Sequence, residues 1–155
     1  MKRHWQGFVL AASMLALGSG AAPANAQVDF GFRASVWLED SDPGVGAELI
    51  IPLGPKHWYF NPNIEGVFSD RSDRLIGNVD FHFDFFETPD LTVWAGAGLA
   101  IVHHQDPLPD QDDTELGANL LAGIGWKLDK VLPYAQLKAV LADDSELVAA
   151  VGVRF

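Results

Sequence analysis

The feature of this sequence that most constrains its fold is an alternation of apolar and polar residues with a period of two. In residues 29–38, the apolar residues Phe30, Phe32, Ala34, Val36 and Leu38 alternate with Asp29, Gly31, Arg33, Ser35 and Trp37. In residues 75–85, Val79, Phe81, Phe83 and Phe85 alternate with Asn78, Asp80, His82 and Asp84. Successive side chains of a β-strand point to opposite faces, so the pattern predicts strands with one apolar face and one polar face.

Eight segments of this kind follow one another along residues 27–155. They are residues 29–38, 48–53, 58–68, 75–85, 91–102, 115–128, 134–141 and 146–155. We expect polar loops at 39–44, 69–74, 103–114 and 142–146, and shorter turns at 54–57, 87–90 and 129–133. Strands of about ten residues joined by turns predict an all-β protein.

The first 26 residues have a different pattern. Lys2 and Arg3 precede the apolar run Phe8 to Leu17, and a stretch of small residues ends at Ala24-Asn25-Ala26. A basic start, a short apolar run and an A-x-A site are typical of a cleavable secretory signal peptide. The apolar run is too short to cross a bilayer as a helix. We therefore predict an exported chain whose residues 1–26 are removed and whose residues 27–155 form one domain.

Composition excludes several classes of function. The chain has a formal net charge of −11, which argues against nucleic-acid binding because that needs a basic face. Apolar residues make up 48% of the chain, too many for a disordered acidic tail. Cysteine is absent, so disulfides, thiol catalysis and cysteine metal sites are excluded. No glycine-rich phosphate loop is present, and we expect no cofactor.

Two architectures fit eight alternating strands. A soluble β-sandwich would bury the apolar faces, whereas a membrane barrel turns them toward lipid and keeps the polar faces inside. The export signal, the strand lengths and the even strand count favour the barrel. Aromatic residues on the apolar faces would also form a belt at one membrane interface: Phe30, Trp58, Phe60, Phe85, Trp126 and Phe155. We therefore predict an eight-stranded, antiparallel, up-and-down transmembrane β-barrel with both termini in the periplasm.

The end of the chain carries a family resemblance. The tail LVAAVGVRF alternates and closes on Phe155, and it resembles the C-terminal signature of bacterial outer-membrane barrels. The segments FNPNIEGVF, NVDFHFDF and TELGANLLAGIGW, with the tail, are similar to the small outer-membrane β-barrel domain family of Gram-negative bacteria. The resemblance implies location in the outer membrane, recognition of Phe155 by the barrel-assembly machinery, and contact with lipid and lipopolysaccharide. It implies no particular activity, because fold does not fix function.

The polar faces predict an ion network inside the barrel. An eight-stranded barrel is just wide enough for side chains to fill it, and buried charges must be paired. The candidate interior residues are four bases, four acids and one histidine: Arg33, Lys127, Lys138, Arg154, Glu48, Glu65, Asp80, Asp84 and His82. We favour a plugged, structural, monomeric barrel that maintains the envelope. A narrow pore for small solutes is the alternative.

Catalysis is a second alternative. Asp80 and Asp84 lie two residues on either side of His82, on the same strand face, where a carboxylate could orient the imidazole. No serine stands close to them in sequence, and no His-x-Ser pair like that of lipid A deacylases is present. We expect the histidine to belong to the ion network rather than to a lipid-modifying enzyme. The acidic loop His103 to Asp113 lacks the ligand spacing of a calcium loop, so we expect no metal centre there.

Overall fold

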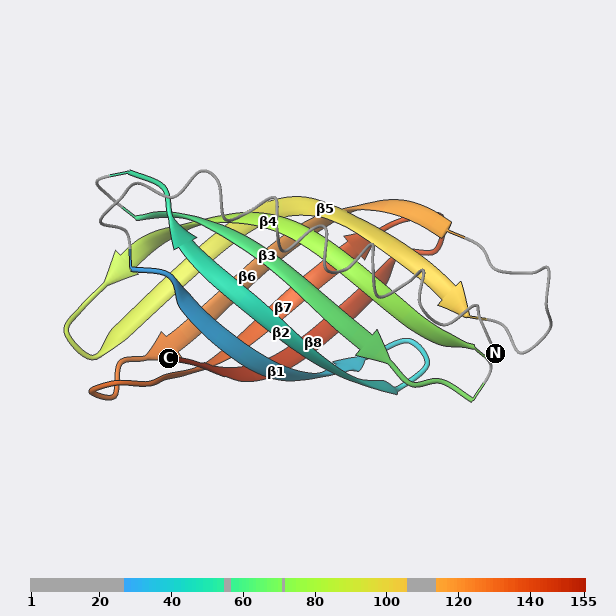
Figure 1. Cartoon of the computed structure of the whole chain (residues 1–155), viewed down its shortest axis with the longest axis horizontal. Helices are drawn as coiled ribbons and strands as arrows, with labels where there is room; N and C mark the ends of the chain where they lie inside the picture. Colours follow the sequence, from blue (N-terminus) through green and yellow to red (C-terminus); the bar gives the residue numbers. More distant parts are fainter. Residues whose placement is uncertain (1–26, 55–56, 71, 106–113) are drawn as a thin grey trace.

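A computed structural model describes residues 27–54, 57–70, 72–105 and 114–155 of the chain, and these form a closed β-barrel of eight strands (Figure 1). The strands are β1 (Asp29–Trp37), β2 (Asp42–Pro52), β3 (Trp58–Val67), β4 (Asp73–Glu87), β5 (Leu91–Gln105), β6 (Thr114–Trp126), β7 (Leu132–Leu141) and β8 (Glu146–Arg154). No helix among the described residues is long and apolar enough to cross a bilayer.

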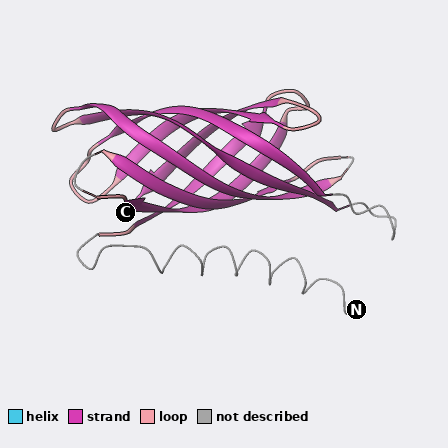
Figure 2. Cartoon of the chain, turned by 90° about the horizontal axis from the view of Figure 1, so that it is seen from above, coloured by secondary structure: helices cyan, strands magenta, loops and turns pink. Residues whose placement is uncertain are grey.

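Each strand pairs antiparallel with the next, and the last pairs with the first. The closing ladder between β1 and β8 runs from Gly31 opposite Arg154 to Trp37 opposite Val148. The chain then continues the pairing beyond the ladder, because the Phe155 amide donates to the Phe30 carbonyl at 2.9 Å. Closure leaves no sheet edge with unpaired backbone groups, which is the condition for a sheet to lie in hydrocarbon (Figure 2).

The two ends of the barrel differ. The turn end holds the starts of β1, β3, β5 and β7 and the ends of β2, β4, β6 and β8. The loop end holds the ends of β1, β3, β5 and β7 and the starts of β2, β4, β6 and β8. Both Asp29 and Phe155 therefore lie at the turn end, as an even number of antiparallel strands requires (Figure 1).

The outer surface carries the apolar half of each alternation. In β1 the outward residues Phe30, Phe32 and Val36 are 42–56% exposed, and the inward residues between them are buried. Five of the six rim aromatics expected from the sequence are exposed near the turn end: Phe30, Trp58, Phe85, Trp126 and Phe155. The sixth, Phe60, is half-buried beside Phe81, its partner on β4. A closed all-β barrel with an apolar outside confirms the predicted fold class.

The interior is filled by side chains rather than by a second sheet. Near the loop end, seven buried inward residues form an apolar layer: Trp37, Val67, Ile76, Ala100, Val102, Val140 and Val148. Nearer the turn end, Trp94, Leu121 and Tyr134 form a smaller cluster. Glycines make room for this filling: a Cβ at Gly123 would run into the indole ring of Trp94.

Several strands begin earlier than the sequence pattern indicated. Residues 42–44 belong to β2 and residues 73–74 to β4, although both stretches were predicted as loop. The ladders explain the difference, because Asp42 pairs with Trp37 and Arg74 pairs with Val67 and His104. Polar residues at these positions interrupt the alternation of apolar and polar residues, so the sequence pattern did not show where these strands begin. The predicted signal peptide, residues 1–26, lies outside the described residues and stays a prediction.

Candidate functional site: the barrel interior

The predicted interior residues come from six strands, and alternation turns most of them into the lumen. Seven lie at inward positions and are at most 7% exposed: Arg33, Glu48, Glu65, Asp80, His82, Lys138 and Arg154. Asp84 is partly buried near the turn end, where β4 has an irregularity in its pairing with β5. The structure thus brings eight of the nine candidates into one interior.

The ninth candidate, Lys127, does not belong to the interior network, so the prediction for this residue was wrong. β6 ends at Trp126, so Lys127 belongs to the turn that follows and is not an inward strand residue. Its ammonium contacts the carboxylate of Glu87 at the rim, and the two side chains are 29% and 37% exposed. The predicted strand, 115–128, extended two residues beyond the end of β6, into the turn where the Lys127 amide donates to the Asp90 carbonyl instead of to a strand partner.

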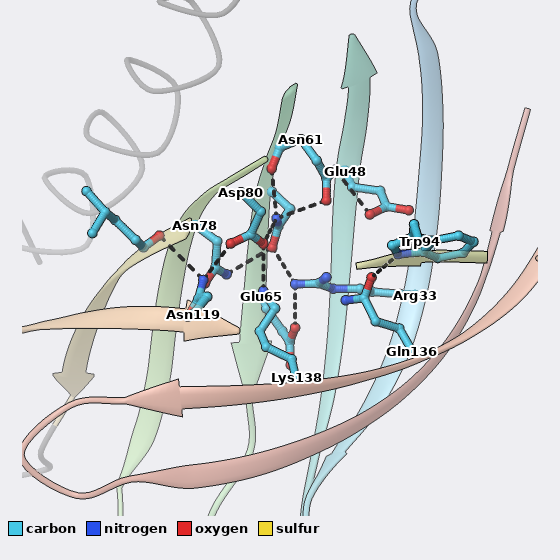
Figure 3. Close-up of polar contacts among 12 residues, drawn as sticks. Arg33, Glu48, Asn61, Glu65, Asn78, Asp80, Trp94, Asn119, Gln136 and Lys138 are labelled. Atoms are coloured by element: carbon cyan, nitrogen blue, oxygen red, sulfur yellow. Dashed lines mark hydrogen bonds and ion pairs between the residues drawn. The ribbon is translucent and has the colours of Figure 1, made fainter. Parts of the chain in front are cut away.

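Asp80 is the centre of the interior network. Its side chain is fully buried, and three groups donate to its two oxygens: Lys138 Nζ at 2.8 Å, Asn63 Nδ2 at 2.9 Å and Asn119 Nδ2 at 2.7 Å. Asn78 joins the amides to one another, since it donates to Asn63 and accepts from Asn119. A buried carboxylate with one ammonium and two amide donors has its charge and its lone pairs satisfied. Figure 3 shows Asp80 and Asn78 from β4, Asn119 from β6 and Lys138 from β7 pointing toward one another.

A second arm of the network centres on Glu65. Arg33 lies 2.8 Å from one carboxylate oxygen of Glu65 and also donates to the Asn63 side chain. The other oxygen accepts from the Ser35 hydroxyl and from the Trp37 indole at 2.9 Å. Asn63 therefore links the Glu65 arm to Asp80, and the middle of the barrel is one connected polar network.

The layer next to the turn end combines an ion pair with aromatic rings. Arg154 Nε donates to Glu48 Oε1 at 2.8 Å. The Arg154 guanidinium also lies over two rings, 4.6 Å from the Trp94 centroid and 4.5 Å from the Tyr134 centroid. The cation thus lies within contact distance of two aromatic rings, an arrangement that stabilises a desolvated arginine.

The loop end has an ionic cap that the sequence analysis missed. Arg74 Nη2 lies 3.1 Å from Asp42 Oδ2, and the same guanidinium contacts the Glu146 carboxylate. It also lies over the Trp37 ring, with Cζ 4.6 Å from the ring centroid. All three charged residues stand at or next to the first residue of a strand. All three also fell within predicted loops, although Glu146 was in addition the first residue of the last predicted strand. Only the strand register shows that they face inward. The interior amides Asn61, Asn63, Asn78, Asn119 and Gln136 were also left out of the predicted network, because only charges were counted.

The lysine and arginine pairs of the interior share one property: each joins strands that are not neighbours in the sheet. Arg33 and Glu65 join β1 to β3, and Glu48 and Arg154 join β2 to β8. Asp80 and Lys138 join β4 to β7. Arg74 on β4 reaches both β2 and β8. These ion pairs therefore reach over at least one strand inside the lumen, and Asp80–Lys138 and Arg74–Glu146 join opposite parts of the wall.

A void between the central network and the loop-end layer is very small. It is bounded by Arg33, Trp37, Glu65 and Lys138, among others, and has a volume of about 10 Å³. That is roughly the space of one water molecule.

His82 is held by aromatic rings. It stacks on Tyr59 at 5.1 Å and lies 5.8 Å from Trp94, while its Nε2 is 3.6 Å from Asp84 Oδ1. Ser35, a serine on the interior face, donates to Glu65 instead. No group of three or more metal-ligating side chains occurs in the described part of the chain.

Comparison with solved structures identifies the fold class. The N-terminal β-barrel domain of Pseudomonas aeruginosa OprF superposes with a TM-score of 0.71 at 18% identity, covering 84% of this chain and 98% of that one. Neisserial surface protein A gives 0.63 at 14% identity, with 83% and 94% covered. Ail, the attachment invasion locus protein of Yersinia pestis, gives 0.51 at 15% identity, with 84% and 97% covered.

These matches show the fold: the chain has the architecture of the small, eight-stranded bacterial outer-membrane β-barrels. The resemblance seen in the sequence is confirmed at that level. A de novo designed transmembrane β-barrel matches with a TM-score of 0.63 at 12% identity, covering 83% of this chain and 92% of the design. No family model matches the sequence, and no curated protein does.

Proposed function

We propose that this protein is a plugged outer-membrane β-barrel with a structural, envelope-maintaining role. The observation that carries the proposal is that the interior ion pairs lie inside the lumen and join non-adjacent strands, with Asp80–Lys138 connecting β4 to β7. A pore needs a continuous water path, and here that path would have to pass Asp80 and its three donors, Arg33 and the loop-end apolar layer. The fold alone does not separate a plug from a pore, so the contents of the lumen carry the distinction.

The interior contacts favour a closed lumen over one that opens and closes. Opening the lumen would separate Lys138 from Asp80, both almost fully buried. Separating the two would break a direct hydrogen bond between charged groups, which stabilises more than a hydrogen bond between neutral groups. The contact therefore favours the closed arrangement of the lumen.

A non-catalytic role is part of the same proposal. His82 is enclosed by Tyr59 and Trp94, and the interior serine Ser35 is engaged with Glu65. A nucleophile activated by His82 would need to lie within hydrogen-bond reach of its ring. Lipid modification by His82 is the alternative, and mass spectrometry of lipid A tests it. Cells with and without the protein should show the same acyl pattern; a changed pattern that disappears in His82→Ala would overturn the assignment.

Outer-membrane lipid and lipopolysaccharide are the proposed surroundings. The exposed aromatic and aliphatic outer surface fits hydrocarbon, and the rim aromatics fit the interface at the turn end. The turn end would then face the periplasm. Phe155 stacks on Phe30 at 5.3 Å, where the closing strands meet, and we propose it as the recognition element for the barrel-assembly machinery. A monomer is the proposed state, since the sheet closes on itself.

Planar-bilayer recording is the direct test of the plug. The folded protein, verified by heat-modifiable migration on unboiled gels, should give no stable stepwise current, while a general porin in the same lipid does. Lys127→Ala is a matched control, because Lys127 lies at the rim and its loss should leave the lumen closed. Stable single-channel steps from the unmodified protein would replace the plug by the narrow-pore alternative.

A further inference from the structure

A groove of about 650 Å³ lies on the outer wall of the barrel, over four strands that follow one another around it: β6, β7, β8 and β1. Each of these strands contributes an outward alanine to the lining, namely Ala122, Ala135, Ala149 and Ala34. The shortness of these side chains leaves the wall hollow at this place. A volume of this size falls within the range of sites that bind small organic molecules, roughly 300–1,000 Å³.

The strand register makes the groove continuous and sets its direction. Ala135 on β7 pairs with Ile124 on one side and with Val151 on the other, and Val151 in turn pairs with Ala34 on β1. Ile124 lies two residues from the turn end of its strand, whereas Ala34 lies in the middle of β1. The groove therefore runs obliquely, from beside the turn-end rim on β6 to the middle of the wall on β1.

The groove is part of the surface that faces hydrocarbon. All the outward side chains that line it are alanine, valine, leucine or isoleucine, and Val36, Leu137 and Val151 are 42–60% exposed. The exposed residues Leu120 and Leu147 continue the same apolar surface beyond the groove on β6 and β8. Within a bilayer, such a hollow is filled either by a lipid acyl chain or by another protein surface that lies in the membrane.

A second copy of this chain would fill the groove poorly. Two copies related by a two-fold axis present the same patch to each other, so the hollow of one copy would face the hollow of the other. The void between them would lose the van der Waals contacts that hold protein surfaces together in a membrane. An acyl chain is narrow and flexible, and it can follow an oblique groove along its length.

The charges at the two rims favour one leaflet as the source of the lipid. At the loop end, the connections that adjoin β1 and β8 carry four exposed acids: Glu39, Asp40, Asp143 and Asp144. At the turn end, the turn that joins β6 to β7 carries Lys127 and Lys130 beside one acid, Asp129. Lys127 contacts Glu87, and Lys130 is exposed. A lipid phosphate is attracted to a lysine at the turn end and repelled by the acids at the loop end.

We propose that this groove holds one acyl chain of a phospholipid from the leaflet at the turn end. The chain lies along Ala122, Ala135 and Ala149, and the phosphate lies near Lys130, at the level of the exposed indole of Trp126. The proposal rests on the outer-membrane location proposed above. It does not depend on the plug, because the groove lies outside the lumen.

Native mass spectrometry of the folded barrel tests this proposal. The protein is released from micelles of an uncharged polyoxyethylene detergent after titration with palmitoyl-oleoyl phosphatidylglycerol. One phospholipid should stay bound. Ala135→Leu places a larger side chain in the groove and should weaken retention at least about fivefold. Ala139→Leu is the matched control, because Ala139 is an equally half-buried outward residue of β7 that does not line the groove.

A second variant tests the position of the headgroup. Lys130→Gln should weaken retention of phosphatidylglycerol about fivefold, and it should leave retention of a diacylglycerol with the same chains unchanged. Unchanged retention of phosphatidylglycerol would overturn the headgroup assignment. Preferential retention of lipid A would overturn the choice of leaflet.

Three other results would overturn the proposal as a whole: no retained lipid, equal retention by Ala135→Leu and the unmodified protein, or a dimer that Ala135→Leu dissociates. If Ala135→Leu does not migrate as a folded barrel, Ala149→Leu replaces it with the same expected loss. Bilayer recording separates this proposal from the plug. A barrel that conducts and retains the lipid would refute only the plug, and a closed barrel that retains none would refute only the lipid site.

Discussion

Removing the charge from one member of the Asp80–Lys138 pair should destabilise the barrel far more than removing both charges. Asp80 is fully buried and Lys138 is 5% exposed, with 2.8 Å between their charged atoms. Their direct attraction is about 6 kcal/mol at an effective dielectric constant near 20. Asp80→Asn leaves the ammonium buried without a counter-charge, which should cost about 3–5 kcal/mol of unfolding free energy.

The reciprocal change should cost somewhat less. Lys138→Met leaves the carboxylate with its two amide donors, Asn63 and Asn119, so part of its stabilisation survives. The double variant has no unpaired charge and loses mainly one hydrogen bond of about 1 kcal/mol. The pair should therefore show a favourable coupling energy of at least about 2 kcal/mol in a double-mutant cycle.

Urea unfolding of the barrel reconstituted in lipid vesicles, followed by tryptophan fluorescence, gives the four free energies of the cycle. The rim pair Glu87–Lys127 is the matched control, because both side chains are partly exposed and such pairs couple by at most about 1 kcal/mol. Coupling below about 0.5 kcal/mol for Asp80 and Lys138 would refute the reasoning, since it would mean that the two charges do not depend on each other.

Three further predictions concern packing, assembly and processing. Gly98→Ala would push a methyl group into the carboxylate of Asp80, so it should lower stability by about 1–3 kcal/mol or more in the same urea assay, whereas Gly66→Ala meets no atom within 4 Å and should not clash. Phe155→Ala should reduce the heat-modifiable fraction of the protein in cell envelopes, and equal assembly of both proteins would contradict the proposed signal. N-terminal sequencing of the exported protein should begin at Gln27, directly after Ala26; a retained leader would contradict the predicted cleavage.

The outward half of the barrel could be predicted from the sequence because lipid imposes one simple rule. Residues such as Phe30, Phe32 and Val36 must be apolar at every second position, and a period of two shows this directly. Glu48, Glu65 and Asp80 were predicted as interior residues for the same reason. The positions of the strands, and which residues of each strand face outward, follow from the local alternation of residues. A single sequence shows that alternation directly.

The interior was harder to predict, since it does not follow a single rule. Ile76 and Val102 lie at inward positions although they are apolar, and they pack on Trp37 to form the loop-end layer. Arg74 is inward although it lies among polar residues at the start of a strand. Which charges meet depends on the stagger of strands far apart in the chain, and no local pattern reports that stagger.

The same dependence gives the interior pairs a meaning beyond stability. Glu48 and Arg154 are separated by 106 residues, and Arg74 and Glu146 by 72, yet neither pair joins neighbouring strands. Hairpin formation alone cannot bring such partners together; they meet only when the sheet has curved and closed. A one-residue slip in any ladder would turn one partner toward lipid, where an unpaired charge is strongly unfavourable. The interior ion pairs form only in the correct register, so they favour that register when the barrel closes. This gives the interior charges a role that apolar side chains of similar size could not supply.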